Sequence, residues 1–575
     1  MPLPLDLAGH PEDRVLRQLV AALLFEGLTS FTLRGEDRVA FTLEDSDYRC
    51  RASFSAFGRV RIRPGSIEMK GDDGRWIAAT LASVVRGLPG TGITRGKLLR
   101  EMEQTIALCR WNSDNIPHRD RRAMSFADLD AALDEGHPYH PCFKARYGFT
   151  TKDNQSFGPE SMQPFQLVWV LHARAEISQE LPDEERDFWR RELGEDVWDE
   201  IESRRQAKGL AWADFALVPM HPWQWQHLMS GPADEFVAAG GLHALGAFGD
   251  RYLASQSLRT LHNLDRPSAA TIKLPLDVVN TSSRRILDPH SVCTAPVLSR
   301  WIAGMVEADT AFTDRYPLAI LQEYAGVLGQ HEGKLSGQIG AIWRESATAG
   351  LNPGEKVIPL NALMMLEEDG KPFIDLWVQR FGLMPWLNRL LEIAILPVWH
   401  LLVHHGLAVE AHGQNMLLVH RDGWPERLVL RDFHESIEFS PAFLRDPDAA
   451  PDFLSLNPLY RDAKPDQYYW TDNLDFLREL VVDTLFIYNL SEVAHLFEEI
   501  YRLPETVFWE QVDHLLHGYA HEHGAGRRMA ALGYDQPTIL TESLLTRKLL
   551  ARDPEYHHRI PNILANVTPQ RRTMP

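Results

Sequence analysis

Residues 410–432 read EAHGQNMLLVHRDGWPERLVLRD, two apolar runs joined by a turn sequence. Asp422 and Gly423 are the residue types that tight hairpin turns prefer, so MLLV and RLVL are predicted to pair as antiparallel strands. Opposed residues in such a pair are fixed by the position of the turn. A turn centred on Gly423 and Trp424 places Asn415 opposite Asp432.

An amide and a carboxylate that face each other offer the hard oxygen ligands that Mg²⁺ takes together with water and phosphate oxygens. Glu410 is close enough in sequence to complete the set. In an extended segment Glu410, His412 and Gln414 share one side, and Gly413 lets a ligand approach the backbone. The alternative is that each is a strand-end residue paired to backbone. Taken together with Asp432, the group favours a magnesium site.

The composition is that of a globular protein, with 44% hydrophobic and 24% charged residues over 575 positions. This length predicts two or three domains and room for a deep cleft. The net charge of -20 disfavours nucleic acid and anionic membranes as partners, because both are bound through Lys and Arg. An anionic substrate would therefore require a local concentration of basic residues.

Hydrophobic periodicity predicts an α+β fold in three parts, with boundaries near residues 160 and 375. The first part, 1–160, is expected to contain helices at 15–25 and 80–111, a loop at 112–122, a short helix ending near 135, and a meander of strands at 31–33, 39–43, 52–57 and 60–62. The second, 161–375, mixes helices with strand-like runs at 165–173, 270–279 and 318–324. The third, 376–575, is mostly helical apart from the hairpin.

Residues 251–300 hold seven Lys or Arg and three Asp or Glu, a local excess of positive charge. On the strand-like run the alternating apolar residues share one face, which leaves Lys273 on the other face, over a cleft, and Pro275 indicates an edge or bulged strand. Hydroxyls beside guanidiniums suit phosphate or carboxylate. A solvated basic loop is the alternative. The candidate anion-binding residues are Ser257, Arg259, Thr260, Lys273, Thr281, Arg284 and Arg285.

The segment HPYHPCFKAR brings two imidazoles and two cations together. Two histidines three apart suggest zinc, but each precedes Pro, which disfavours helical geometry, and no further ligands are near. An anion-holding loop with histidines available for proton transfer is the favoured prediction. Its residues are His137, His140, Lys144 and Arg146.

Other features are interpreted structurally. In HPWQWQH, Pro222 fits the first position of a helix, and Trp223 and Trp225 are expected to fill an interdomain core. The four cysteines are scattered without a CxxC pair, which is typical of a reducing cytoplasm. The N-terminus lacks the pattern of a signal peptide, and polar residues and Pro397 interrupt the apolar run 390–403, so no membrane span is expected.

These motifs, in this order, resemble those of the siderophore synthetases that work independently of nonribosomal peptide synthetases, the IucA/IucC or aerobactin synthetase-like family. The matching segments are GHPYHPCFKARYGF, HPWQWQH, SQSLRTL, KLPLDVVNTSSRR, EAHGQN and RDF. The resemblance implies a cupped-hand architecture of thumb (1–160), fingers (161–375) and palm (376–575), with a distantly kinase-like palm. It also implies a cytoplasmic homodimer.

The resemblance further implies that ATP and Mg²⁺ are used to adenylate a carboxylate of citrate or of a citryl monoamide. An amine or alcohol then displaces AMP. It assigns Glu410, Asn415 and Asp432 to Mg²⁺. The other implied roles are contacts to the triphosphate or substrate carboxylate by Ser257, Arg259, Thr260, Lys273 and Arg285. Gln414 is assigned to ATP binding, and His412 lies beside the reacting groups.

Two other functions remain open from the sequence. An ATP-dependent phosphotransferase would use the same metal ligands but would form ADP. The chain lacks the glycine-rich phosphate loop typical of such enzymes. A non-catalytic binder of citrate or ferric citrate would need no ligands for Mg²⁺ and ATP. The spacing from Thr281 favours Arg285 over Arg284 as the site arginine.

Overall fold

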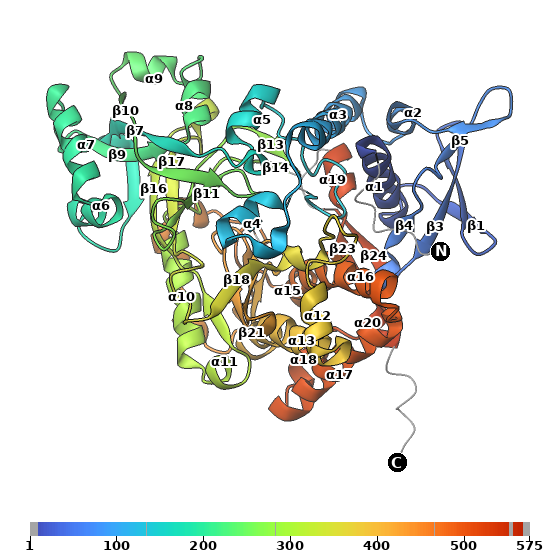
Figure 1. Cartoon of the computed structure of the whole chain (residues 1–575). Coiled ribbons are helices and arrows are strands. Elements are labelled where there is room, and N and C mark those ends of the chain that lie inside the picture. Colours follow the sequence, from blue (N-terminus) through green and yellow to red (C-terminus); the bar gives the residue numbers. More distant parts are fainter. Residues whose placement is uncertain (1–9, 134, 282, 465, 551–555, 567–575) are drawn as a thin grey trace.

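The chain begins with a helix packed against an antiparallel sheet (Figure 1). The computed structural model describes residues 10–133, 135–281, 283–464, 466–550 and 556–566. Helix α1 (Pro11–Phe25) buries its apolar face, and its Pro stands at the N-terminus, where an N–H is not needed. The expected meander is confirmed and extended. Its strands are β1 (Phe31–Arg34), β2 (Arg38–Leu43), β3 (Ser46–Phe54), β4 (Val60–Ile62), β5 (Glu68–Lys70) and β6 (Trp76–Ala78).

The helix expected over 80–111 is two helices, α2 (Leu81–Arg86) and α3 (Gly92–Asn115). Each begins with a threonine, Thr80 or Thr91, whose side chain accepts a hydrogen bond from the backbone three residues on. The break between them contains Pro89, which disfavours helix at the residue before it. Helix α3 continues into the segment expected as loop, and α4 (Phe126–Ala132) is the predicted short helix.

The middle of the chain forms an eight-stranded antiparallel sheet in the order β8-β16-β17-β12-β11-β10-β7-β9. Strand β7 (Phe165–Ala173) has the predicted bounds. Helices α6 (Glu185–Leu193) and α7 (Glu195–Ala207) lie at its outer end (Figure 1). The other strands are β8 (Ile177–Glu180), β9 (Phe215–Met220), β10 (Leu242–Ala254), β11 (Thr260–Asn263), β12 (Thr271–Lys273), β16 (Glu323–Gly329) and β17 (Gly340–Arg344).

Strand β12 corrects one expectation. It ends at Lys273, before Pro275, and it lies between β11 and β17 in the interior of the sheet rather than at an edge. Proline has no N–H to donate to a neighbouring strand, so the pairing stops where it appears. The chain then runs on irregularly to short strands β13 (Val279–Asn280) and β14 (Ser283–Arg284). Lys273 is thus the last residue of a central strand.

The run expected as one strand at 318–324 is divided between two sheets. Strand β15 (Leu318–Ile320) pairs in parallel with β21 (Trp424–Leu430), in a four-stranded sheet that also contains β20 (Met416–Arg421) and β18 (Glu355–Pro359). Strand β16 belongs to the eight-stranded sheet. The chain therefore passes from one sheet to the other between residues 320 and 323.

The predicted hairpin is β20 and β21, but its expected register is wrong. The turn lies at Asp422 and Gly423, because Arg421 pairs with Trp424. A register shift beyond His420 then leads to pairing of Met416 with Leu430. Asn415 consequently faces Arg431, whose backbone N–H donates to the Asn415 carbonyl (3.1 Å). Asp432 lies outside the strand with φ +66°, a backbone conformation that L-residues adopt rarely.

The C-terminal part is mostly helical, as expected, and its main helices are α13 (Leu383–His400), α15 (Leu474–Val481), α16 (Ser491–Tyr501) and α17 (Glu505–His523). The largest hydrophobic core joins residues from 15–145 with residues from 298–564, and a second core lies within 167–343. An α+β fold is confirmed. The boundaries near 160 and 375, and the kinase-like character of the last part, stay predictions.

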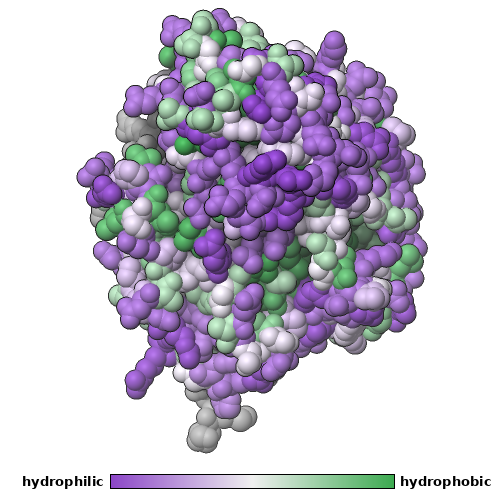
Figure 2. Space-filling view, turned by 90° about the vertical axis from the view of Figure 1, so that its left-hand side faces the viewer, coloured by the Kyte–Doolittle hydropathy of each residue, from purple (hydrophilic) through white to green (hydrophobic). Residues whose placement is uncertain are grey.

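Two helical segments, Leu383–His405 and Leu474–Tyr501, are long and apolar enough to cross a membrane by length and composition. The most apolar stretch of each is 78% buried inside the protein, so these segments face the core. The molecular face on the side of the eight-stranded sheet is mainly hydrophilic, with hydrophobic residues gathered in a hollow (Figure 2). Hydrophilic residues thus dominate the surface that this view presents.

Candidate functional site

A cleft of about 1810 Å³ lies among the three parts of the chain. Its walls include the hairpin end, the end of β12 and the HPYH segment. The predicted site residues that line it are His137, His140, Ser257, Arg259, Lys273, Thr281, Arg285, Glu410, His412, Gln414, Asn415 and Asp432. Segments far apart in sequence therefore converge on one space, as the motifs had indicated.

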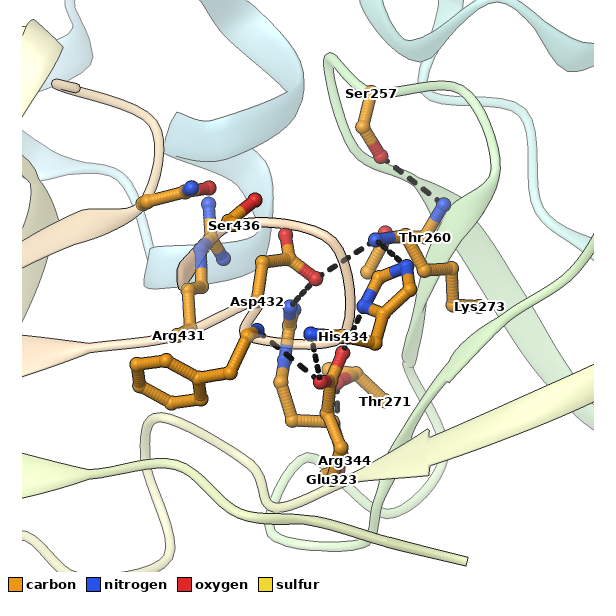
Figure 3. Close-up of polar contacts among 12 residues, drawn as sticks. Ser257, Thr260, Thr271, Lys273, Glu323, Arg344, Arg431, Asp432, His434 and Ser436 are labelled. Carbon is orange, nitrogen blue, oxygen red and sulfur yellow. Dashed lines mark hydrogen bonds and ion pairs between the residues drawn. The ribbon is translucent and has the colours of Figure 1, made fainter. Parts of the chain in front are cut away.

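Asp432 lies at the centre of an ion-pair cluster (Figure 3). Its Oδ1 is 2.9 Å from Lys273 Nζ and 2.8 Å from Arg344 Nη1. Burial opposes ionisation, but these two cations hold the pKa of Asp432 well below its usual range. Arg344, from β17, was not predicted, because nothing near it in sequence marks it as a site residue.

His434 and Glu323 complete this cluster and were also missed. His434 Nδ1 donates to Glu323 Oε1 (2.8 Å), which leaves Nε2 to accept from Lys273 Nζ (3.2 Å). Glu323 also accepts from the backbone N–H groups of Phe433 and His434, both at 3.1 Å. Burial lowers the pKa of Lys273, and Asp432 counteracts this. The residues HE directly after RDF were a usable signal for His434. Glu323 is the first residue of β16, far away in sequence, and no motif around it marks it as a site residue.

Three cleft histidines share one arrangement. The Nδ1 of His137 accepts from the backbone N–H of residues 139 and 140 (3.1 Å each), that of His140 from residue 142 (3.1 Å), and that of His412 from residues 414 and 415 (3.2 Å each). The ring proton of each neutral imidazole is therefore on Nε2. Burial lowers the pKa of His137 to about 3 and that of His140 well below its usual value. Both are neutral hydrogen-bond donors at neutral pH.

The orphaned polar atoms beside these histidines indicate an anion. His140 Nε2 and Arg285 Nε are buried, and neither has a hydrogen-bond partner among the described residues. Arg285 Nη2 donates to the carbonyl of Asn280 (2.9 Å). Burial and the nearby Arg259 lower the pKa of Arg285 to about 10, so it stays a cation at neutral pH. A substrate carboxylate would satisfy both donors.

The two adjacent arginines point to different environments. Arg284 is exposed and forms an ion pair with Asp277, whereas Arg285 is half-buried, with its Nε fully buried, and lines the cleft. Asp277 is in turn bound by His227 (3.0 Å) from helix α8 (Pro222–Leu228). Helix α8 begins with Pro222, as predicted. The HPWQWQH motif therefore helps to hold Arg284 through Asp277, and its own residues do not line the cleft.

Lys144 and Arg146 do not line the cleft. Both are buried and share Glu160, with Lys144 Nζ 3.0 Å and Arg146 Nη2 2.7 Å from its Oε1. These cations hold the pKa of Glu160 far below its usual range despite burial. Thr260 is also outside the cleft wall, and its backbone N–H donates to Ser257 Oγ (3.1 Å). The cations after HPYH therefore anchor the loop, while its histidines face the ligand space.

Glu410 and Asn415 lie together at the hairpin end. The Asn415 amide donates to the Glu410 backbone carbonyl (3.2 Å), and Ser436 Oγ donates to Glu410 Oε2 (2.6 Å). With its NH₂ group used in this way, the Asn415 side-chain carbonyl remains as an oxygen donor. These oxygens and the Asp432 carboxylate are hard ligands of the kind that Mg²⁺ prefers. The donor set fits magnesium, although Asn415 and Asp432 are not opposed across the strands.

A second group of possible metal ligands, Asp309, His400, His404 and His405, lies away from the cleft. Asp309 Oδ2 is 3.1 Å from His400 Nε2 and 2.9 Å from His405 Nε2. The guanidinium of Arg445 contacts His404. Because the Arg445 guanidinium already contacts one of these histidines, we interpret the group as a hydrogen-bonded cluster. Cys50, Cys142 and Cys293 are free thiols.

Comparison with known proteins agrees with this geometry. Residues 125–365 match the family model described as IucA / IucC family, and residues 384–556 match one described as ferric iron reductase FhuF-like transporter. No cysteine of this chain lies within 384–556.

Relatives match over nearly the whole length. The citryl-spermidine/3,4-dihydroxybenzoyl-citryl-spermidine:spermidine ligase of Bacillus anthracis is 33% identical over 96% of this chain and 93% of its own. The aerobactin synthase of Escherichia coli is 27% identical over 96% of this chain and 97% of its own. The crystal structure of the petrobactin biosynthesis protein AsbB from Bacillus anthracis str. Sterne superposes with a TM-score of 0.91 at 32% identity, covering 97% of this chain and 95% of that one. The chain belongs to the IucA/IucC family of siderophore synthetases.

Proposed function

We propose that this ligase of siderophore biosynthesis uses ATP to adenylate a carboxylate of citrate, or of a citryl monoamide, and then joins the acyl group to an amine. The observation that carries the proposal is the group of unsatisfied donors formed by Arg285 and His140 beside the Lys273 cluster, in a single cleft. A relative that matches over nearly the whole chain is named for citryl and spermidine chemistry, which supports citrate as the acid.

In the first step a carboxylate oxygen attacks the α-phosphorus of ATP, and pyrophosphate leaves. The reaction brings two anions together, so preorganised positive charge lowers its barrier. Lys273, Arg259 and Ser257 are proposed to hold the phosphates. Arg285 and the Nε2–H donors of the cleft histidines are proposed to hold the carboxylate.

In the second step the nitrogen of a neutral amine attacks the acyl carbon, the bond from that carbon to the phosphate oxygen breaks, and AMP leaves. The proton lost from nitrogen passes to solvent or to a nearby base. His412 lies next to Glu410, with Nε2 3.8 Å from a carboxylate oxygen, and is proposed to orient the reacting groups as an Nε2–H donor. Glu410, Asn415 and Asp432 would hold Mg²⁺, which would supply positive charge at the phosphates.

The product mixture tests the proposal. Incubation with ATP, citrate and an amine should yield AMP and pyrophosphate, and citrate alone should support exchange of labelled pyrophosphate into ATP. Formation of ADP would identify a phosphotransferase instead. The absence of both, with citrate, 2-oxoglutarate and succinate each tried as the acid, would leave only a non-catalytic binder.

Cytoplasmic location and a homodimer remain predictions from the family. Size-exclusion chromatography with light scattering measures the second directly, and a monomer at working concentrations would contradict it.

A further inference from the structure

One wall of the cleft carries two buried carboxylates, each with one oxygen that has no hydrogen-bond partner among the described residues. Glu479 and Asp483 both line the cleft. Glu479 Oε2 and Asp483 Oδ1 are buried, and neither accepts a hydrogen bond within the described part of the chain. A buried carboxylate oxygen without a partner is costly, so this pair is not explained by packing.

The remaining oxygens of the pair are used by the protein. Asp483 Oδ2 accepts from Thr541 Oγ1 (2.8 Å) and from the backbone N–H of Glu542 (2.9 Å), and Glu479 Oε1 is 2.9 Å from His557 Nε2. These contacts fix the orientation of both side chains. The nearby Arg547 is bound to Glu542 (2.5 Å), so it neutralises a different carboxylate.

Local helix geometry places the pair together. Glu479 lies in α15, and Asp483 lies four residues later in a π-helical segment, η10 (Val482–Leu490). Side chains four apart share a helix face, and π-helical turns occur frequently at functional sites. Burial and the adjacent Glu479 raise the pKa of Asp483 well above its usual value. Two acids held together, each with an unpartnered buried oxygen, form a site for a cation.

The pair is next to the reacting groups. Thr484, which follows Asp483, accepts a hydrogen bond through Oγ1 from the backbone N–H of Ala411 (2.9 Å), the residue between Glu410 and His412. Tyr488, from the same helical segment, has its ring 6.2 Å from that of His137. One side of the cleft thus carries anion donors and the adjoining wall carries cation acceptors.

We propose that Glu479 and Asp483 bind a protonated nitrogen of the amine substrate, which is therefore a diamine or polyamine rather than a monoamine. The inference rests on the proposed function. One nitrogen is held as ammonium by the two carboxylates, and a second, neutral nitrogen is presented to the acyl-adenylate. Arg285 and Lys273 repel the ammonium end, so the chain of the amine is oriented along the cleft.

The test compares the double variant E479Q/D483N with the wild type. The KM for spermidine and for putrescine in amide formation should rise about tenfold or more, since a hydrogen-bonded charge contact contributes about 1.5–3 kcal/mol. Hydroxylamine, which is uncharged at neutral pH, should form hydroxamate from the acyl-adenylate at similar rates in both proteins. Wild-type preference for putrescine over butylamine should shrink in the variant.

The matched control is E510Q, which removes one negative charge from an exposed position on α17. It should retain wild-type kinetics with every amine. An unchanged KM for spermidine in E479Q/D483N would overturn the inference. Failure of the wild type to exchange pyrophosphate would instead remove the proposed function, so the two failures are distinguishable.

Discussion

The ammonium of Lys273 lies 2.9 Å from the carboxylate of Asp432, although the two residues come from different sheets and from sequence positions 159 apart. Arg344 contacts the same carboxylate oxygen at 2.8 Å. A phosphate that binds Lys273 therefore competes with Asp432 for the ammonium, and an Asp432 freed in this way becomes available to a cation. Phosphate and metal binding are thus expected to be linked.

Removing Lys273 tests the phosphate role. K273A should lower citrate-dependent pyrophosphate exchange about hundredfold or more, because loss of one preorganised charge costs about 3 kcal/mol in the transition state. Circular dichroism and the unfolding midpoint serve as the folding control. Normal exchange in K273A would exclude Lys273 from adenylation.

The adjacent arginines form a matched pair of variants. R285A should abolish most citrate-dependent exchange, whereas R284A should retain it, because only Arg285 lines the cleft and has an unpartnered donor there. Exchange rates at saturating ATP and varied citrate separate the two. Equal losses in both variants would contradict the assignment.

The anchoring role of Glu160 predicts a stability effect. E160A leaves Lys144 and Arg146 buried without their shared partner, so the free energy of unfolding should fall by about 3–5 kcal/mol. Urea unfolding measures this change. A variant with normal stability but a raised KM for citrate would instead make this cluster part of the substrate site.

Burial of His137 predicts acid sensitivity. Its pKa is lowered from 6.5 to about 3, so its contribution to stability is complete above pH 6.5 and is lost as the pH falls toward 3. H137Q should flatten the decline of the unfolding temperature over this interval. The exposed His517 on α17 provides the control, H517Q. The charged groups that face His137 are Arg59, Arg285, His412 and Glu492.

Asp483 is expected to affect the pH dependence of stability in the opposite direction to His137. Its raised pKa means that its contribution to stability is present at low pH and lost as the pH rises through the folded-state value. D483N should therefore unfold at a higher temperature than the wild type at neutral pH, while an equal or lower unfolding temperature would show that the carboxylate is not strained. The charged groups that act on it are Glu479 and Glu542, and His557 contacts Glu479.

Sequence alone located most of the cleft because its motifs concentrate polar residues beside apolar strands. It failed where side-chain direction depends on a local irregularity. The turn lies one residue earlier than expected, which shifts the pairing by two positions, and the bulge beyond His420 restores one of them, so Asn415 faces Arg431. It also failed for Lys144 and Arg146, because the partner that buries them, Glu160, lies in a different helical turn.

The crossing from β15 to β16 constrains how the cleft works. Only residues 321 and 322 separate these strands, and Glu323, the first residue of β16, binds the backbone of the segment that carries Asp432. The walls on either side of the phosphate site are therefore tethered through a very short connection. Wide opening about a hinge at this point would break the hydrogen bonds of Glu323, so we expect substrates to enter, and AMP to leave, with the two walls held at a nearly constant spacing.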